Sequence, residues 1–211
     1  MGYHQAGFDV IGVDIEPQPN YPFEFICADA LSGLWYSRRN PDAVHALPPC
    51  QRYSDLAKRN GNADDWPDMV ADVRRALQAS DLPYVIENVE GAPLHNPITL
   101  CGTMFPNLRV IRHRLFETNF PINTNDLTHP RKHPLVFTHD KRKKHYGQLN
   151  QDTAFVQVTG GGNATLANKL DAMGCDWMQT HREVNEAIPP AYTEWIGRQL
   201  IQHVTGAVRD Q

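Results

Sequence analysis

The segment FDVIGVD at residues 8–14 is a short apolar run, rich in β-branched residues, that ends in an acid. This composition predicts a buried β-strand. Strands are also predicted at 23–29 (FEFICAD), which again ends in Asp, at 43–47 (AVHAL), which ends before two prolines, and at 83–89 (PYVIENV), which carries Glu87 near its end. A helix is predicted at 66–80, with one apolar face made of Met69, Val70, Val73, Ala76 and Leu77. Strands that alternate with helical or irregular segments are typical of an α/β fold with a parallel sheet and crossover connections.

The second half of the chain predicts a different mixture of elements. Strands are expected at 99–105, 112–120 and 154–159, and a helix at 165–173. Thr180 and Glu183 have the spacing of a capping box, which predicts the start of another short helix. The pair Pro189 and Pro190 ends that helix and can open the last one. Residues 121–151 are polar, basic and dotted with prolines, which favours an irregular segment.

Length and composition restrict the class of protein. The 211 residues suit one domain, or one domain with a small insert, and 41% hydrophobic with 21% charged residues excludes global disorder. No apolar run is long enough to predict a membrane span, and the first residues lack the pattern of a signal peptide. The scattered cysteines form no CxxC pair, which argues against a zinc ribbon or a disulfide framework and favours a cytoplasmic protein. They are Cys27, Cys50, Cys101 and Cys175.

The net charge of −4 does not indicate a polyanion ligand, but the segment 126–145 carries a local charge of +4. Clustered cations gain affinity for phosphates by releasing counterions, so this segment is a candidate nucleic-acid contact; the alternative is a solvated loop. Its basic residues are Arg131, Lys132, Lys141, Arg142, Lys143 and Lys144. It also holds four histidines, His129, His133, His139 and His145. No acid or cysteine at a typical spacing accompanies them, so no metal is predicted.

Candidate site residues follow the ends of the predicted strands, where ligands bind in an open α/β sheet. Asp14 ends the first strand and Asp29 the second. Either acid can accept hydrogen bonds from ribose hydroxyls or an adenine amino group, although a turn or helix cap is the simpler role. Cys50 follows two prolines that could hold a thiolate in place, whereas a lone cysteine is usually a buried apolar residue. Glu87 ends the apolar run YVIE, so we expect it to be partly buried and able to hold a proton near neutrality.

Four motifs together resemble those of the cytosine-C5 DNA methyltransferases. The segment 48–51 (PPCQ) followed by Tyr53 and Ser54 resembles the family's catalytic motif, and 87–89 (ENV) its second catalytic motif. The segment 112–116 (RHRLF) is similar to the paired-arginine motif, and 187–197 resembles the motif that returns to the cofactor pocket. All four occur in family order and cover most of the chain. The patterns CGTMF, RHRLFETNF and IPPAYTEWIG suggest the compact branch found in phages and actinobacteria.

The resemblance implies a reaction and roles for individual residues. Cys50 would add to C6 of a cytosine that has been flipped out of the duplex, so that C5 can accept a methyl group. Glu87 would protonate or hydrogen-bond N3, and Arg114 would hold O2. Arg112 would support this catalytic site.

The resemblance also implies S-adenosylmethionine as cofactor and double-stranded DNA as partner, with a cognate restriction endonuclease as a further candidate partner. Implied cofactor contacts are Asp14, Ile15, Asp29, Ala30, Pro49, Glu186 and Ala187. Implied DNA contacts are Gln51, Ser54 and the six basic residues of 126–145.

A Rossmann-like methyltransferase sheet is the implied fold. It would comprise a catalytic core at 1–117, a small target-recognition region at 118–175 and a C-terminal segment at 176–211 that returns to the core. The family opens with a strand and a glycine-rich turn, whereas residues 1–4 resemble the helix that follows them. We therefore expect either a start that has been assigned too late or an N-terminally truncated form of the sheet.

Three alternatives compete with a DNA methyltransferase. The small recognition region also fits methylation of a free cytidine nucleotide. Loss of the first strand fits a non-catalytic DNA-binding homologue. A cysteine hydrolase built from Cys50 and His45 is disfavoured, because His45 lies in the strand just upstream and no orienting acid accompanies it.

Overall fold

A computed structural model describes residues 1–32, 39–138, 141–159 and 164–209. Contacts between residues divide the chain into two compact units. Unit 1 comprises Met1–Phe8, Leu100–His113 and Thr124–Gly197, and unit 2 comprises Asp9–Thr99, Arg114–Asn123 and Arg198–Gln211. Each unit draws on the predicted core, the predicted recognition region and the predicted C-terminal segment, so the compact units do not follow those three boundaries.

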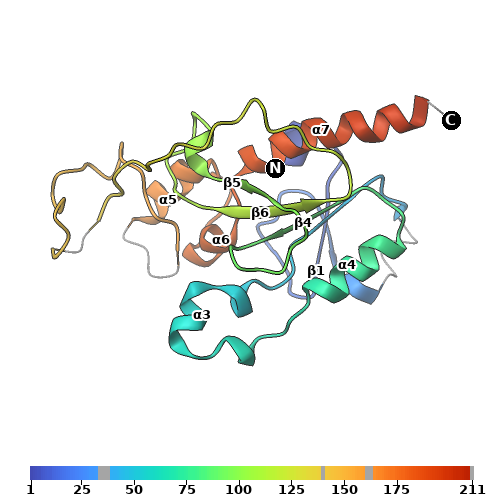
Figure 1. Cartoon of the computed structure of the whole chain (residues 1–211), viewed down its shortest axis with the longest axis horizontal. Coiled ribbons are helices and arrows are strands. Elements are labelled where there is room, and N and C mark those ends of the chain that lie inside the picture. Colours follow the sequence, from blue (N-terminus) through green and yellow to red (C-terminus); the bar gives the residue numbers. More distant parts are fainter. Residues whose placement is uncertain (33–38, 139–140, 160–163, 210–211) are drawn as a thin grey trace. The chain divides into compact units, whose positions relative to one another are not determined.

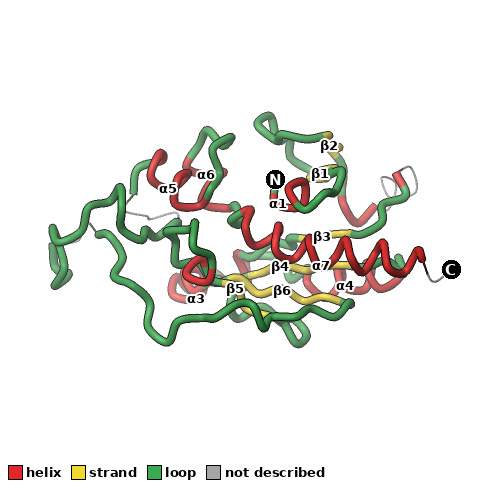
Figure 2. Tube along the Cα trace, turned by 90° about the horizontal axis from the view of Figure 1, so that it is seen from above, coloured by secondary structure: helices red, strands yellow, loops and turns green. Residues whose placement is uncertain are grey.

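Two sheets of short strands lie largely in unit 2 (Figure 1). The first pairs β1 (Ile11–Asp14) with β2 (Glu24–Cys27) in parallel. The second has the order β3-β4-β6-β5, and Figure 2 shows these strands in yellow. Its strands are β3 (Val44–Ala46), β4 (Tyr84–Asn88), β5 (Ile98–Leu100) and β6 (Arg114–Thr118). β3 and β4 are parallel, whereas β6 runs antiparallel to β4.

The strand pattern confirms the α/β class and the parallel pairing of the first four strands, β1 with β2 and β3 with β4. The first four strands were expected in one parallel sheet, whereas they are divided between two sheets. The strand predicted at 112–120 had no predicted direction, and it is antiparallel to β4. A buried strand was predicted at 8–14, but β1, like β2 and β3, is half-buried or exposed, whereas β4 is buried throughout. Apolar composition also does not specify which partner a strand pairs with or in which direction.

Helix α4 (Val70–Ala79) packs its apolar face against β4 in unit 2 (Figure 1). Val73 and Leu77 form a core cluster with Tyr84 and Ile86. The helix begins later than predicted. Residue 66 precedes a proline and has extended backbone, with φ −103° and ψ 142°, because a proline disfavours helical geometry in the residue before it.

The buried face of α4 contains one charge that the apolar pattern did not predict. Ala76 was expected to be buried but is exposed, and Arg74 is buried instead. Arg74 donates from Nε and from one terminal nitrogen to the two carboxylate oxygens of Glu117, both at 2.7 Å. The same terminal nitrogen donates to the Pro93 carbonyl at 2.8 Å, and the His95 amide donates to Glu117 at 2.7 Å. This buried pair ties α4 and the loop after β4 to β6.

The surroundings of Glu117 also determine its protonation. Burial alone would raise the pKa of this carboxyl. Hydrogen bonds from Arg74 and from the His95 amide outweigh burial and hold the pKa of Glu117 below its ordinary value. Glu117 is therefore a carboxylate at neutral pH, and the contact with Arg74 is a buried ion pair.

Unit 1 is built mainly from helices and irregular segments. Its helices are α1 (Gly2–Gln5), α5 (Leu166–Met173), α6 (His181–Glu186) and the first part of α7 (Pro190–Arg209). The predicted helix starts are confirmed. The Thr165 hydroxyl caps α5, Thr180 and Glu183 form the capping box of α6, and Pro190 opens α7.

Two predicted strands are wrong over most of their length. The strand expected at 99–105 ends at Leu100 and gives way to a 3₁₀ turn at Gly102–Met104. Gly102 lets the backbone approach the Val110 carbonyl so closely that a Cβ atom would lie 2.0 Å from its oxygen. The strand expected at 154–159 is reduced to isolated bridges at Phe155 and Val156, because each neighbouring segment pairs at one residue only.

Candidate functional site

The predicted catalytic segments 48–50 and 87–89 lie side by side in unit 2. β3 and β4 are parallel with Ala46 opposite Ile86, so the residues that follow each strand leave the sheet at the same edge. The Asn88 side chain donates from Nδ2 to the Pro48 carbonyl at 3.0 Å. This bond joins the segment that carries Cys50 to the end of the strand that carries Glu87.

The second arginine of the predicted pair reaches the same edge. β6 runs antiparallel to β4 with Asn88 opposite Leu115, so Arg114, the first residue of β6, lies at the carboxyl end of β4. Arg114 Nε lies 2.8 Å from Glu87 Oε1, and both side chains are largely buried. Glu87 is only 6% exposed, as its position at the end of an apolar run predicted. A guanidinium and a carboxyl held in this way can present paired hydrogen-bonding groups to a polar ring.

Cys50 is half-buried and does not belong to the core. It directly precedes the 3₁₀ turn Gln51–Tyr53, and its carbonyl accepts from the Tyr53 amide at 3.1 Å. Pro48 is buried and Pro49 is half-buried, so the backbone that leads to the thiol is anchored in the sheet. A thiol in this position is partly accessible, which a nucleophile requires.

Arg112, the first arginine of the pair, belongs to unit 1. It is buried, and its guanidinium donates to the carbonyls of Val158 at 2.6 Å and Asn185 at 2.7 Å. Lys169 is buried nearby and donates to the Asn185 side chain at 2.7 Å. Burial, followed by the charge of Arg112, lowers the pKa of Lys169. The hydroxyl of Tyr192, within the C-terminal motif, donates to the Arg112 carbonyl at 2.7 Å. Arg112 therefore joins this motif to other segments of unit 1.

The predicted cofactor acids follow β1 and β2 and are exposed. Asp14 accepts from the Glu16 amide at 2.9 Å, and Asp29 accepts from the Leu31 amide at 2.9 Å. Each acid therefore stabilises a turn, which was the simpler of its two predicted roles. Its carboxylate oxygens can still accept further hydrogen bonds. Ile15 follows directly and is 70% exposed, and Ala30 is exposed as well.

The remaining predicted cofactor residues, Glu186 and Ala187, lie in unit 1 at the end of α6. Glu186 is exposed and accepts from Arg182 at 3.3 Å.

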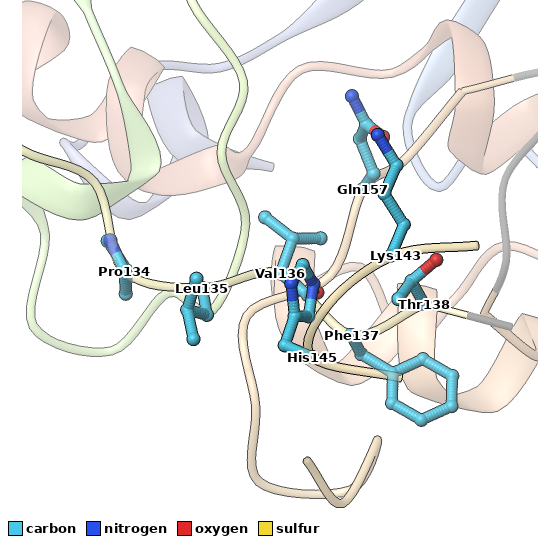
Figure 3. A pocket seen from close by; sticks show the side chains of 8 residues that line it. All are labelled: Pro134, Leu135, Val136, Phe137, Thr138, Lys143, His145 and Gln157. Carbon is cyan, nitrogen blue, oxygen red and sulfur yellow. The ribbon is translucent and has the colours of Figure 1, made fainter. Parts of the chain in front are cut away.

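The predicted DNA contacts fall into two groups. In unit 2, Gln51 is exposed, whereas the Ser54 hydroxyl caps α3 (Asp55–Asn60) by accepting from the Ala57 amide. In unit 1, all six basic residues of 126–145 are exposed. A pocket of about 310 Å³ lies in the same segment (Figure 3), and its lining brings Phe137 and other apolar side chains together with Lys143. Exposed cations next to an apolar surface suit phosphate and base contacts.

His45, the alternative partner for Cys50, is half-buried on β3, and its ring nitrogen Nε2 is buried. Burial lowers its pKa to about 3, and its ring lies 6.3 Å from that of Phe116 on β6. Such a histidine stays uncharged at neutral pH, which makes it a poor base for a hydrolase.

A cluster of possible metal ligands lies in unit 1, where the sequence predicted none. Cys101, His113, His129 and His133 each offer one ligand atom, and these four atoms all lie within 4.8 Å of one another. Only His129 and His133 belong to the histidine set noted in the sequence. His145 instead contacts the Val136 carbonyl at 3.0 Å, and His139 lies outside the described residues. The spacing of His129 and His133 was a local signal, but the two remaining members come from distant segments.

Comparisons with known proteins identify no family for this chain. No protein-family model matches the chain, and neither does any curated protein. Within the described parts of the chain, every helix is too short or too polar to cross a bilayer. Function is therefore inferred from the motifs and from the positions of their residues in the fold.

Proposed function

We propose that this protein is a DNA cytosine-C5 methyltransferase and that unit 2 carries a Rossmann-like methyltransferase sheet. One observation carries the proposal. The ion pair of Arg114 and Glu87 lies at the strand end that Asn88 bonds to the Cys50 segment. Three motifs separated in sequence thus meet at the edge of a sheet where ligands bind. The parallel pairs β1-β2 and β3-β4 are compatible with such a sheet.

The residues of this edge suit addition to a pyrimidine. The Cys50 thiolate forms a bond from Sγ to C6 of cytosine, and the displaced electron pair makes C5 a carbon nucleophile. Protonated Glu87 donates to N3 and stabilises the charge that develops on the ring, while Arg114 holds O2 and orients Glu87. When C5 has been methylated, its proton passes to water and the bond from Sγ to C6 breaks, which restores the thiolate.

The exposed ends of β1 and β2 suit the adenosine part of the methyl donor. The Asp14 and Asp29 carboxylates can accept from ribose hydroxyls or an adenine amino group, and the exposed side chain of Ile15 offers an apolar surface for the base. S-adenosylmethionine, when bound, supplies an electrophilic methyl group.

DNA is the proposed substrate because of the basic segment in unit 1. Lys141, Arg142, Lys143 and Lys144 are consecutive and exposed, and phosphate contacts contribute most of the affinity of such a segment. A base inside a duplex must be flipped out before a thiol can reach it.

The test is transfer of a labelled methyl group from S-adenosylmethionine to duplex DNA and, separately, to dCMP. We expect label in the DNA and none after Cys50→Ala. Label in dCMP alone would make the protein a nucleotide methylase. DNA binding without any transfer would make it a non-catalytic homologue. Methylation by Cys50→Ala would contradict the assigned nucleophile.

A further inference from the structure

We propose that Cys101, His113, His129 and His133 form a structural zinc site in unit 1. The inference is independent of the proposed methyl transfer, because all four residues belong to unit 1 and the proposed catalytic Cys50, Glu87 and Arg114 belong to unit 2. Cys101 lies near the start and His113 at the end of the segment Leu100–His113 of this unit. His129 and His133 lie in the irregular part of the segment that begins at Thr124.

The distances between the ligand atoms match a tetrahedral ion. Nε2 of His129 lies 3.1 Å from Nε2 of His113 and 3.3 Å from Nε2 of His133, and Nε2 of His133 lies 3.6 Å from Cys101 Sγ. Zinc bonds of about 2.0–2.1 Å to nitrogen and about 2.3 Å to sulfur at tetrahedral angles separate neighbouring ligands by about 3.4 Å (N to N) and about 3.6 Å (N to S). These three separations fit a zinc site, and all four ligand atoms lie within 4.8 Å of one another.

Hydrogen bonding among the histidines explains this arrangement less well than an ion does. A bond between two imidazoles uses one N–H group and one lone pair. Here Nε2 of His129 faces the Nε2 atoms of both His113 and His133, so one proton cannot serve both contacts. A central cation lets all three nitrogens present lone pairs. The centroids of the three rings lie only 5.0–5.3 Å apart, so the rings surround a common point.

The donor set and its surroundings favour zinc and a structural role. One sulfur and three imidazole nitrogens are typical zinc ligands, and four protein ligands leave no open position for catalysis. Cys101 is fully buried, and the Thr103 hydroxyl donates to its sulfur at 3.2 Å, which stabilises a thiolate. The ion would join the segment Leu100–His113 to the basic segment 126–145. In the basic segment, Arg131 and Lys132 lie between the ligands His129 and His133.

The test is zinc content after purification and dialysis, measured by plasma mass spectrometry. We expect about one zinc per chain in the wild-type protein. Zinc should be absent from Cys101→Ser and from His129→Ala, and retained in His181→Ala, which removes an exposed histidine of α6 outside the cluster. His129 is itself exposed, so its replacement removes a ligand with little effect on packing. Wild-type protein without stoichiometric zinc, or both ligand variants with full zinc, would overturn the proposal.

A second readout does not depend on whether a variant folds. Trypsin cleaves after Arg131 and Lys132, and both are exposed. If zinc fixes His129 and His133 on either side of them, a chelator should accelerate cleavage at these two sites in the wild-type chain, and added Zn²⁺ should restore protection. Equal cleavage rates with and without the chelator would also overturn the proposal.

Discussion

Replacing Arg74 by methionine is the sharpest test of what stabilises unit 2. The change removes both hydrogen bonds that the guanidinium makes to the Glu117 carboxylate and the bond it makes to the Pro93 carbonyl. Methionine keeps the unbranched stem that packs along α4. The substitution therefore leaves the helix largely intact and removes the charge that neutralises a buried carboxylate.

The magnitude follows from the burial of the pair. The side chains of Arg74 and Glu117 are 10% and 3% exposed. Removing one partner of a buried pair costs about 3–5 kcal/mol, because the remaining charge is left uncompensated. The neighbouring Arg75→Met is the matched control, since Arg75 pairs with Asp72 at 2.7 Å on the exposed face of the same helix. An exposed pair of this kind contributes only about 0–1 kcal/mol.

Urea titration at several pH values measures both the size of the effect and its cause. The pKa of Glu117 is lower in the folded wild-type protein than in the unfolded chain. The ion pair therefore makes its full contribution to the stability of the fold at pH values above the pKa that Glu117 has in the unfolded chain. That contribution is lost as the pH falls through the folded pKa. In Arg74→Met the unpaired Glu117 carboxyl can take up a proton, which removes its buried charge. The difference in free energy of unfolding between the wild-type protein and Arg74→Met should therefore narrow as the pH falls from 7 toward 4. A gap under about 1 kcal/mol at pH 7, or one that does not change with pH, would refute the reasoning.

Four further changes test other parts of the account. Glu87→Gln should slow methyl transfer strongly while leaving the circular dichroism spectrum unchanged; an equal rate would remove Glu87 from the catalytic group. Replacing all four residues 141–144 by glutamine should weaken DNA binding. It should also reduce the slope of log affinity against log salt concentration by about 0.9 for each DNA phosphate that the protein no longer neutralises. An unchanged slope would show that the segment does not contact DNA. Gly102→Ala should destabilise the protein by about 3 kcal/mol or more in thermal unfolding, because the new Cβ would lie 2.0 Å from the Val110 carbonyl oxygen; near-wild-type stability would contradict this. Thr180→Ala should cost about 1 kcal/mol through loss of the cap, and no change in stability would argue against that bond.

Local patterns predicted the elements whose determinants are local. The first four strands were evident as short apolar runs, and α6 was evident because Thr180 and Glu183 form a capping box within a single turn. The meeting of the segments that follow β3 and end β4 also followed from the sequence, since parallel strands end at the same edge.

Features that depend on distant partners were missed. Arg74 lies on the buried face of α4 because Glu117 on strand β6 neutralises its charge. The helical periodicity of the sequence does not reveal that partner. The antiparallel direction of β6 is likewise a property of the pairing and not of the strand itself. Cys101 joins the histidines only because separate segments of unit 1 converge.

Covalent trapping on duplex DNA that contains 5-fluorocytosine tests the central claim most directly. Fluorine at C5 cannot leave as the proton does, so after methyl transfer the bond from Cys50 Sγ to C6 should persist. We predict an adduct that forms only with S-adenosylmethionine present and that peptide mass spectrometry assigns to Cys50. An adduct that survives Cys50→Ala, or DNA that is methylated without any adduct forming, would contradict the account.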